Sequence, residues 1–478
     1  MKLKRSRCKV IFCFLLFGMM LGCGGESGNG SSSSSTGQDS SKTITVDSGS
    51  QMGSFRGLYD GVNAGPYSYK WDKDLSLAAD EIGLTWFRVH DMAGGGVPSP
   101  GDIPQIYGDT GAGDITDPAN YDFSAIDPLI AEAVNGGYNV LYRLGRSFSY
   151  PPLDPGTDPV RWAEAARRII MHFNEGWDNG HYYNIRYWEI FNEPDLSVFW
   201  AGTREQWFAF FDTVFSILKG YYPDLKIGCC GFAGIDREWR TAFLEYCANK
   251  GLDPDFISWH LYNYGIPEIF MTEGEAWQIE MDKHSLTGEN LLTEWGMFGS
   301  GTHPENANAS GAAFYAAALT YMQDSPIDMA FRYRIDGNEI TTPDDGGFNM
   351  INPDPGLTLK IPTCSFKAFK WLSENTPVRI NADGSNTAAG YAVIAGRSPD
   401  DRMVQVIIGD LRSEHTGYNL MIRDLPWGTA TYTYERYVIN DSLCLELVES
   451  GEGSGVSTFQ TKEDLAPPAV HLIKLYTQ

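Results

Sequence analysis

Short apolar runs alternate with longer amphipathic stretches through the middle of this chain. Between about residues 54 and 375, eight runs rich in β-branched and aromatic residues are separated by segments in which apolar residues recur every three to four positions. This alternation is typical of a parallel sheet wrapped by helices, and eight strands close a barrel. The predicted strands are 54–60, 85–91, 138–145, 185–193, 226–231, 256–262, 289–296 and 328–336.

Two of the intervening segments carry clear helix-start signals. Residues 158–174 open with an Asp-Pro pair, and residues 203–220 open with Thr203 and Gln206 at the spacing of a capping box. The stretch 337–363 is rich in Gly, Pro and Asp, so we expect an extended loop after the last barrel strand. The loops that follow the strands of such a barrel carry its chemistry.

After about residue 378 the pattern changes to short strands separated by turn residues. We predict that residues 378–478 form an antiparallel β-sandwich and that residues 43–52 add an edge strand to it. Residues 53–377 then form the barrel. The expected fold class is α/β, a (β/α)₈ TIM barrel with a C-terminal β-sandwich; the strands predicted after the barrel are 390–396, 403–409, 418–423, 429–437 and 469–476.

The first 42 residues predict export rather than a folded element. Five Lys and Arg residues precede the apolar run 10–21, which is typical of a secretory signal and too short to span a bilayer. Met20-Leu21-Gly22-Cys23 resembles the lipobox of bacterial lipoproteins, so residues 1–23 are predicted to be a signal peptide with a lipid anchor at Cys23. Residues 24–42 are Gly/Ser-rich and predict a flexible tether. We therefore expect an exported bacterial lipoprotein at the outer membrane or cell surface.

The charge balance restricts the partners of the protein. The chain has 36 Lys and Arg against 61 Asp and Glu, a net charge of −25. Nucleic acid is excluded as a partner, because its phosphates are held by clustered cations that this sequence lacks. The same excess of acid favours a neutral substrate. The sequence gives no prediction of oligomeric state.

The cysteines match no metal-binding pattern. Five follow Cys23, an odd number without zinc spacing. Disulfides are possible in an exported protein, but a body this large does not need them, so we expect buried thiols. These five are Cys229, Cys230, Cys247, Cys364 and Cys444.

Two glutamates stand at the ends of predicted strands. Glu193 ends one strand within Asn192-Glu193-Pro194, and Glu294 ends another about a hundred residues later. A retaining glycosidase needs such a pair, one carboxylic acid and one carboxylate about 5–5.5 Å apart. Glu189 lies deeper on the first of these strands, and we expect it to be a structural carboxylate paired with Arg88 or Arg143.

Four motifs occur in a characteristic order over residues 54 to about 375. They are Asn192-Glu193-Pro194 with the residues that follow it to Trp200, Asp255 to Tyr262, Thr293-Glu294-Trp295, and Phe87-Arg88-Val89-His90. The chain resembles the clan A glycoside hydrolases and, within that clan, family 39, the group of β-xylosidases and α-L-iduronidases. The resemblance implies that Glu193 is the general acid/base and Glu294 the nucleophile. It also implies that Asn192 donates a hydrogen bond to the sugar 2-hydroxyl.

The resemblance also implies a set of substrate-binding residues. Arg88, His260 and Tyr262 would line the floor of the site, with Arg88 and Tyr262 keeping the nucleophile ionised. A purely structural role for Arg88 or His260 is an equal alternative. The eighth strand lacks the tryptophan that is common in the family, so Tyr333 or Trp295 is expected to supply the aromatic face for the sugar.

Together these observations predict a retaining glycoside hydrolase that acts on carbohydrate without a metal or cofactor. Two alternatives stay open: a carbohydrate-binding surface lipoprotein without catalysis, and an inverting enzyme with carboxyl groups about 6.5–9.5 Å apart. Xylosides, other neutral β-glycosides and uronides all stay open as substrates. So does the choice between trimming chain ends and cutting within a chain.

Overall fold

The computed structural model describes residues 41–477 apart from 95–96, 109–112, 235, 298–303 and 338–346. The predicted signal peptide, the Cys23 anchor and nearly all of the tether lie outside the described residues. Within the described ranges, no helix is both long and apolar enough to cross a membrane.

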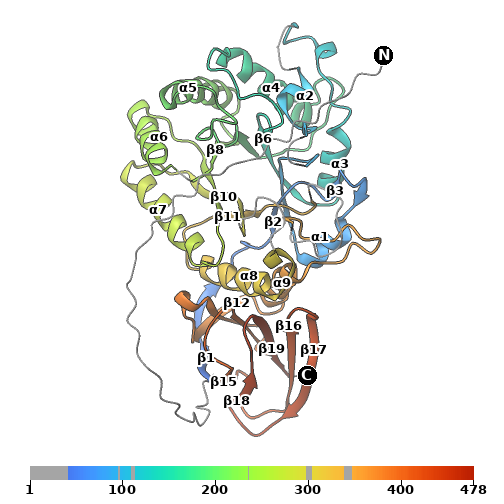
Figure 1. The fold of residues 1–478 in the computed structure, drawn as a ribbon, viewed down its shortest axis with the longest axis vertical. Coiled ribbons are helices and arrows are strands. Elements are labelled where there is room, and N and C mark those ends of the chain that lie inside the picture. Colours follow the sequence, from blue (N-terminus) through green and yellow to red (C-terminus); the bar gives the residue numbers. More distant parts are fainter. Residues whose placement is uncertain are drawn as a thin grey trace, which may run out of the picture. The chain divides into compact units, whose positions relative to one another are not determined.

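Eight parallel strands close into a barrel, in the order β10-β11-β2-β5-β6-β7-β8-β9. The barrel predicted from the alternating pattern is confirmed, and Figure 1 shows its helices arranged around the strands. The barrel strands are β2 (Gly61–Asn63), β5 (Trp86–Val89), β6 (Asn139–Leu144), β7 (Tyr187–Ile190), β8 (Lys226–Phe232), β9 (Phe256–Tyr262), β10 (Glu289–Gly296) and β11 (Met329–Arg332).

Helices follow the barrel strands in turn along the chain. The predicted capping box is present, because the Thr203 hydroxyl accepts from the Gln206 backbone and the Gln206 side chain accepts from the Thr203 backbone. The helices are α1 (Ser76–Ile82), α2 (Ile103–Ile106), α3 (Asp127–Asn135), α4 (Pro159–Glu175), α5 (Arg204–Tyr221), α6 (Arg237–Lys250), α7 (Ile269–Lys283), α8 (Ala309–Met322) and α9 (Cys364–Asn375). A small hairpin, β3 (Tyr67–Ser68) and β4 (Lys73–Asp74), and the 3₁₀ turns η1 (Pro118–Asn120), η2 (Pro304–Ala307), η3 (Ile361–Thr363) and η4 (Thr387–Ala389) complete the connections.

The first barrel strand does not lie where the sequence pattern placed it. Residues 54–60 were expected to be a strand, but the Leu58 N–H donates to the Arg56 carbonyl, which makes a tight turn there. The barrel strand begins instead at Gly61, where an added Cβ would lie 2.4 Å from the Ala330 carbonyl oxygen of β11. The prediction of a strand at 54–60 is therefore wrong. The barrel strand lies where its backbone comes so close to β11 that only glycine fits, and the apolar residues before Gly61 lie outside it.

The remaining strands form one nine-stranded sheet, in the order β17-β16-β19-β14-β13-β12-β1-β15-β18. All neighbours are antiparallel except β1 and β15, and the sheet packs around its own apolar core. Strand β1 has partners on both sides, so the expectation of an edge strand is wrong. The strands are β1 (Lys42–Ser54), β12 (Val378–Asp383), β13 (Tyr391–Arg397), β14 (Met403–Asp410), β15 (Gly417–Arg423), β16 (Tyr432–Ile439), β17 (Cys444–Gly453), β18 (Phe459–Asp464) and β19 (Ala469–Tyr476).

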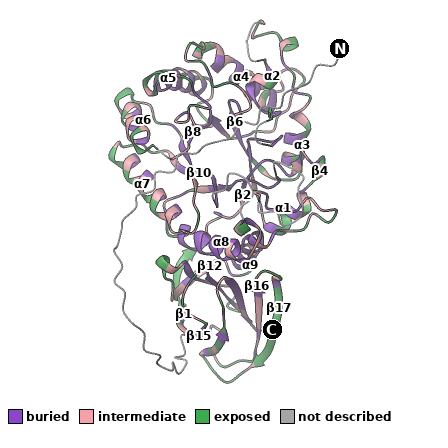
Figure 2. Ribbon diagram, in the orientation of Figure 1, coloured by how far each residue is buried: buried purple, intermediate pink, exposed green. Residues whose placement is uncertain are grey.

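Helices α8 and α9 join the barrel to the sheet. Helix α8 contacts β13, β14 and β19 and is buried almost throughout, as Figure 2 shows. A disulfide between Cys364 of α9 and Cys444 of β17 crosses the same joint, with a Cα–Cα distance of 5.4 Å. Cys229 and Cys230 are also bonded to each other, so the expectation of buried thiols holds only for Cys247. Their sequence separation of 80 concealed the proximity of Cys364 and Cys444.

Candidate active site

The carboxylates of Glu193 and Glu294 meet at the mouth of the barrel. Glu193 follows β7 and Glu294 lies near the end of β10, so parallel strands deliver both side chains to the same rim. One oxygen of each, together with a ring nitrogen of His260, lies within 4.8 Å of the others. The Glu193 side chain is 15% exposed and that of Glu294 6%. The structure thus brings together the two residues that the sequence singled out as catalytic.

The backbone around Glu193 is strained. Phe191 and Glu193 have positive φ angles of 74° and 46°, a conformation that costs on the order of 1–3 kcal/mol for residues other than glycine. The Glu193 N–H is shared between the carbonyl oxygens of Cys230 and Gly231, at 3.1 and 3.0 Å. Such strain persists only where the surroundings fix it, and here it directs the carboxyl group inward.

Gly231 shapes the neighbouring strand end around His260. Its φ of 56° and the 2.8 Å that would separate an added Cβ from His260 Nε2 both require glycine. The Gly231 N–H donates to Ser258 Oγ at 2.8 Å, which fixes β8 against β9. His260 Nδ1 consequently lies 2.8 Å from Glu193 Oε1 and 3.6 Å from Glu294 Oε2.

Arg88 is the cation beneath the glutamate pair. Its fully buried guanidinium donates to Glu189 and to Glu294, both at 2.7 Å. It also donates to Asn63 Oδ1 at 2.9 Å and to Asn192 Oδ1 at 2.8 Å. Of the two partners predicted for Glu189, the structure selects Arg88. One guanidinium therefore links the structural carboxylate to the residues at the rim.

Replacing Arg88 by Met is expected to destabilise the protein strongly. The change leaves Glu189 and Glu294 as buried carboxylates without their cation, which costs about 3–5 kcal/mol of unfolding free energy. Urea denaturation at neutral pH measures the loss. The difference in unfolding free energy between wild type and R88M should shrink as the pH falls. Buried carboxyl groups without a cation have raised pKa values in the folded protein, so they are neutral at low pH and no longer destabilise it. R88K keeps the charge and serves as the control; equal unfolding free energies for wild type and R88M would contradict the assignment.

Glu294 is held in its ionised form. Burial by itself would raise its pKa, but a positive charge on His260, the Arg88 guanidinium and the Tyr262 hydroxyl, which donates to Oε2 at 2.6 Å, together bring the pKa below its ordinary value. Burial lowers the pKa of His260 itself to about 3, so this ring is neutral at neutral pH. Arg88 and Tyr262 are therefore the groups that keep Glu294 charged there.

Glu193 is shifted in the opposite direction. Burial and then the negative charge of Glu294 raise its pKa well above the ordinary value. The neighbouring carboxylate Asp195 adds to this shift. One carboxyl group is thus protonated and its partner ionised over the same pH range, which is the division of states that acid and base roles require.

The other predicted binding residues divide into two groups. Asn192 is 1% exposed, and its Nδ2 has no hydrogen-bond partner among the described residues, so this amide is available to a ligand. Tyr333 donates to Asp91 at 2.9 Å and meets the Tyr262 ring edge-on. The prediction that Trp295 faces the sugar is wrong. Strand alternation turns Trp295 outward from its neighbour Glu294, and it packs fully buried against Phe270, Tyr315 and Phe366.

Three residues of the site were missed as site residues in the sequence. His90 Nε2 lies 3.2 Å from Glu294 Oε1, and because Arg143 Nε donates to Nδ1, the proton of the neutral ring is on Nε2. Asp91 accepts from Tyr333, and the Phe348 ring packs against Tyr333. His90 could have been found in the sequence, because it lies two residues after Arg88 and alternation along a strand places both on the same face. Phe348 lies outside every predicted strand and has no such signal.

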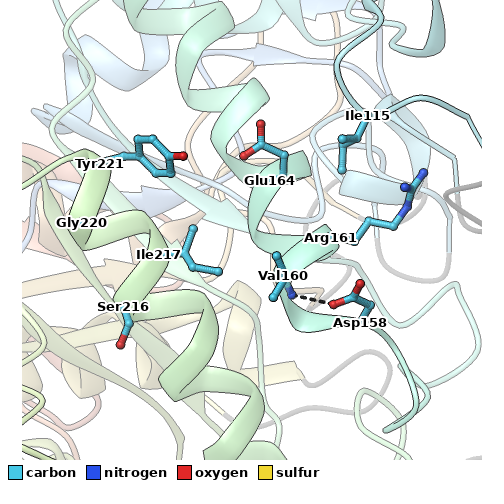
Figure 3. A pocket seen from close by; sticks show the side chains of 9 residues that line it. All are labelled: Ile115, Asp158, Val160, Arg161, Glu164, Ser216, Ile217, Gly220 and Tyr221. Atoms are coloured by element: carbon cyan, nitrogen blue, oxygen red, sulfur yellow. Dashed lines mark hydrogen bonds between the residues drawn. The ribbon is translucent and has the colours of Figure 1, made fainter.

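A surface hollow elsewhere lacks this chemistry. It lies between α4 and α5 (Figure 3), where Asp158 caps α4 by accepting from the Val160 N–H at 2.9 Å. Glu164 is paired with Arg167 and Arg168 at 2.6 and 2.8 Å. Both carboxylates of the hollow therefore already have partners. Its lining residues are Ile115, Asp158, Val160, Arg161, Glu164, Ser216, Ile217, Gly220 and Tyr221.

Comparison with known proteins agrees with the motifs. Residues 146–407, more than half of the chain, match the model of the glycosyl hydrolases family 39. A beta-xylosidase from Geobacillus stearothermophilus is 26% identical over 223 residues (44% of this chain and 42% of the relative), and one from Caldicellulosiruptor saccharolyticus is 24% identical over 348 residues (66% of each). The chain thus spans less than two thirds of each of these relatives. The crystal structure of a glucosidase from Croceicoccus marinus superimposes with a TM-score of 0.75 at 25% identity, covering 92% of this chain and 100% of that one. The resemblance inferred from the four motifs is confirmed: the chain belongs to the glycosyl hydrolases family 39.

Proposed function

We propose that the protein is a retaining glycoside hydrolase. The observation that carries the proposal is the Glu193–Glu294 pair, whose oxygens approach within 4.8 Å while their pKa values shift in opposite directions. That spacing suits direct attack on the sugar and is shorter than the 6.5–9.5 Å that an inverting enzyme needs for its water.

In the first step the protonated Glu193 transfers its proton to the leaving glycosidic oxygen. Glu294 attacks the anomeric carbon as that carbon–oxygen bond breaks, and a covalent glycosyl ester forms. The neutral His260 beside Glu193 Oε1 can donate to that oxygen from Nδ1, which leaves the second oxygen to carry the proton toward the substrate. In the second step Glu193, now a carboxylate, removes a proton from water, and the water displaces Glu294 with the original configuration restored.

Asn192 and Arg88 prepare the site for this reaction. Arg88 fixes the Asn192 amide by donating to Oδ1, so that Nδ2 is the end directed to the substrate. A donor at this place binds the sugar 2-hydroxyl, an interaction that strengthens in the transition state. Tyr262 and Tyr333 supply an aromatic wall beside the carboxylates.

For the substrate we propose a neutral β-glycoside, with β-xylosides tested first. Both relatives described above are named beta-xylosidases, and the net charge of −25 disfavours anionic polymers. We also propose that the protein is exported and lipid-anchored at Cys23. This rests on the charged start, the apolar run and the lipobox-like sequence.

Mechanism-based trapping tests the proposal. A 2-deoxy-2-fluoro-β-xyloside with an activated leaving group should inactivate the protein by forming a stable ester on Glu294, because fluorine slows hydrolysis of the intermediate. Mass spectrometry of a proteolytic digest locates the adduct, and NMR of the first-formed product of an ordinary substrate should show the β anomer. A product that first appears as the α anomer would indicate an inverting enzyme. A protein that binds sugars but yields neither adduct nor product would be a non-catalytic carbohydrate-binding lipoprotein.

A further inference from the structure

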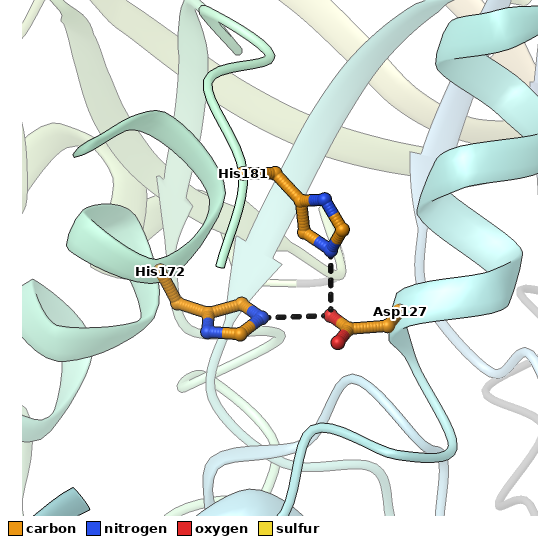
Figure 4. Close-up of side chains that lie close together, drawn as sticks. All are labelled: Asp127, His172 and His181. Atoms are coloured by element: carbon orange, nitrogen blue, oxygen red, sulfur yellow. Dashed lines mark hydrogen bonds and ion pairs between the residues drawn. The ribbon is translucent and has the colours of Figure 1, made fainter. Parts of the chain in front are cut away.

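Three side chains of residue types that bind metal ions converge at a place separate from the glutamate pair. Asp127 begins α3, His172 lies in the last turn of α4, and His181 lies in the connection that leads to β7. Figure 4 shows both imidazole rings directed at the Asp127 carboxylate. Nε2 of His172 is 2.8 Å from Asp127 Oδ1, and Nε2 of His181 is 3.5 Å from the same oxygen.

The hydrogen bonds of His172 indicate which ring nitrogen carries a proton and which one faces the Asp127 carboxylate. Its Nδ1 lies 2.9 Å from the Trp177 carbonyl oxygen, which can only accept, so Nδ1 carries a proton. In the neutral ring Nε2 then presents a lone pair to a carboxylate oxygen 2.8 Å away. Two acceptors at this distance need a cation between them, either a second proton or a metal ion. An Nδ1–H bonded to a backbone carbonyl is also the usual support of a histidine that binds metal through Nε2.

His181 favours the metal ion over the second proton. Its Nε2 is inaccessible to solvent and makes no hydrogen bond within the described part of the chain. With a proton shared by His172 and Asp127, this nitrogen has only its 3.5 Å approach to the Asp127 carboxylate, whereas a metal ion can bind both imidazoles and the carboxylate together. The donor atoms of all three residues already lie within 4.8 Å of one another.

The backbone holds the two histidines together independently of their side chains. The His181 N–H donates to the His172 carbonyl at 2.6 Å, and the Gly176 N–H donates to the His181 carbonyl at 2.9 Å. A Cβ at Gly180 would lie 2.2 Å from the His172 carbonyl oxygen, so this tight turn requires glycine. The His172 ring is stacked on Phe123 with 3.5 Å between centroids. The geometry is therefore set in advance of binding.

We propose that Asp127, His172 and His181 form a structural zinc site that fastens the turn after α4 to the start of α3. Zn²⁺ takes imidazole and carboxylate ligands at about 2.0–2.2 Å in tetrahedral geometry, which separates neighbouring donors by about 3.3–3.5 Å. The His181–Asp127 separation already matches, and the His172–Asp127 pair needs only a small outward shift. The Asp127 and His181 side chains are 30% and 28% exposed, so a water molecule can complete the coordination.

The glutamate pair and His260 form a second cluster of donors, and the test has to separate the two. In that cluster Arg88 and Tyr262 already donate to the Glu294 oxygens. All variants are therefore made in an E294Q background, which removes one charged ligand there. H181A and D127N change the proposed site at its partly exposed members and avoid the buried His172. H284A, which changes a half-buried histidine at the end of α7, is the matched control.

Chelator-treated protein is titrated with Zn²⁺ by calorimetry, and the unfolding temperature is measured with and without Zn²⁺. We expect one Zn²⁺ per chain and a raised unfolding temperature in the background and in H284A. H181A and D127N should each bind at least about tenfold more weakly and lose the thermal shift. Co²⁺ should give visible absorption bands in the background that H181A lacks. The proposal is wrong if the E294Q background binds no stoichiometric Zn²⁺. It is also wrong if H181A or D127N binds Zn²⁺ with unchanged affinity. In either case His172 and Asp127 form an ordinary hydrogen-bonded pair without a metal ion.

Discussion

Replacing Glu294 by Gln should abolish hydrolysis, with a loss in kcat of about 10⁶-fold, the size expected when a covalent nucleophile is removed. The amide keeps the shape of the side chain and cannot form the glycosyl ester. Arg88 and Tyr262, which now hold the carboxylate, would still enclose the residue. The loss in kcat is measured with a saturating aryl glycoside, whose released leaving group is monitored by absorbance.

The matched control lies at the other end of the same strand. Glu289 begins β10, where it is paired with Lys226 at 3.3 Å, and E289Q should keep activity close to wild type. Circular dichroism and the unfolding temperature check that E294Q is folded. A folded E294Q protein with undiminished turnover would eliminate Glu294 as the nucleophile.

Replacing Glu193 by Ala should separate the two chemical steps. Loss of the general acid should slow the hydrolysis of substrates with poor leaving groups about 10²–10⁴-fold. Activated aryl glycosides need little protonation, so Glu294 still forms the ester and the intermediate accumulates. Added azide, which needs no general base, should then release a glycosyl azide of retained configuration. Stopped-flow kinetics and NMR of the azide product provide the measurements.

The pH profile supplies an independent check on Glu193. The proposed mechanism requires Glu294 ionised and Glu193 protonated, so kcat/KM should fall on the acid side as Glu294 gains a proton, below its ordinary pKa. It should fall on the alkaline side as Glu193 loses its proton, well above its ordinary pKa. E193Q has no ionisable group there and should lose the alkaline limb with an activated substrate. An alkaline limb that persists unchanged would assign it to another residue.

Strand periodicity accounts for what could be predicted of the fold. Runs such as Phe256–Tyr262 carry β-branched and aromatic residues at strand length, and the match between predicted and observed strands is good there. It failed at residues 54–60, where a close backbone contact at Gly61 decides the start of the strand. The position of β1 between β12 and β15 also escaped prediction, since pairing across the whole chain leaves no local signal.

The candidate active site was also predictable only in part. Glu193 and Glu294 could be found because each ends a strand within a motif, and parallel strands end at one rim. Trp295 was misplaced because its motif suggested a sugar contact, while alternation along β10 turns it toward the helices. The opposite protonation states of the two glutamates depend on burial and on Arg88, a residue about a hundred positions from each of Glu189 and Glu193. Such long-range electrostatics are set by the folded chain alone.

Strand β1 has a consequence for how the polypeptide matures. Among the elements of residues 41–477 it is synthesised first, yet its partners β12 and β15 follow more than 300 residues later. At roughly 5–20 residues per second, translation leaves this strand without its neighbours for tens of seconds while the barrel is made. The C-terminal sheet therefore cannot be completed until both β1 and β19 are available, and loss of either strand would separate the strands on its two sides.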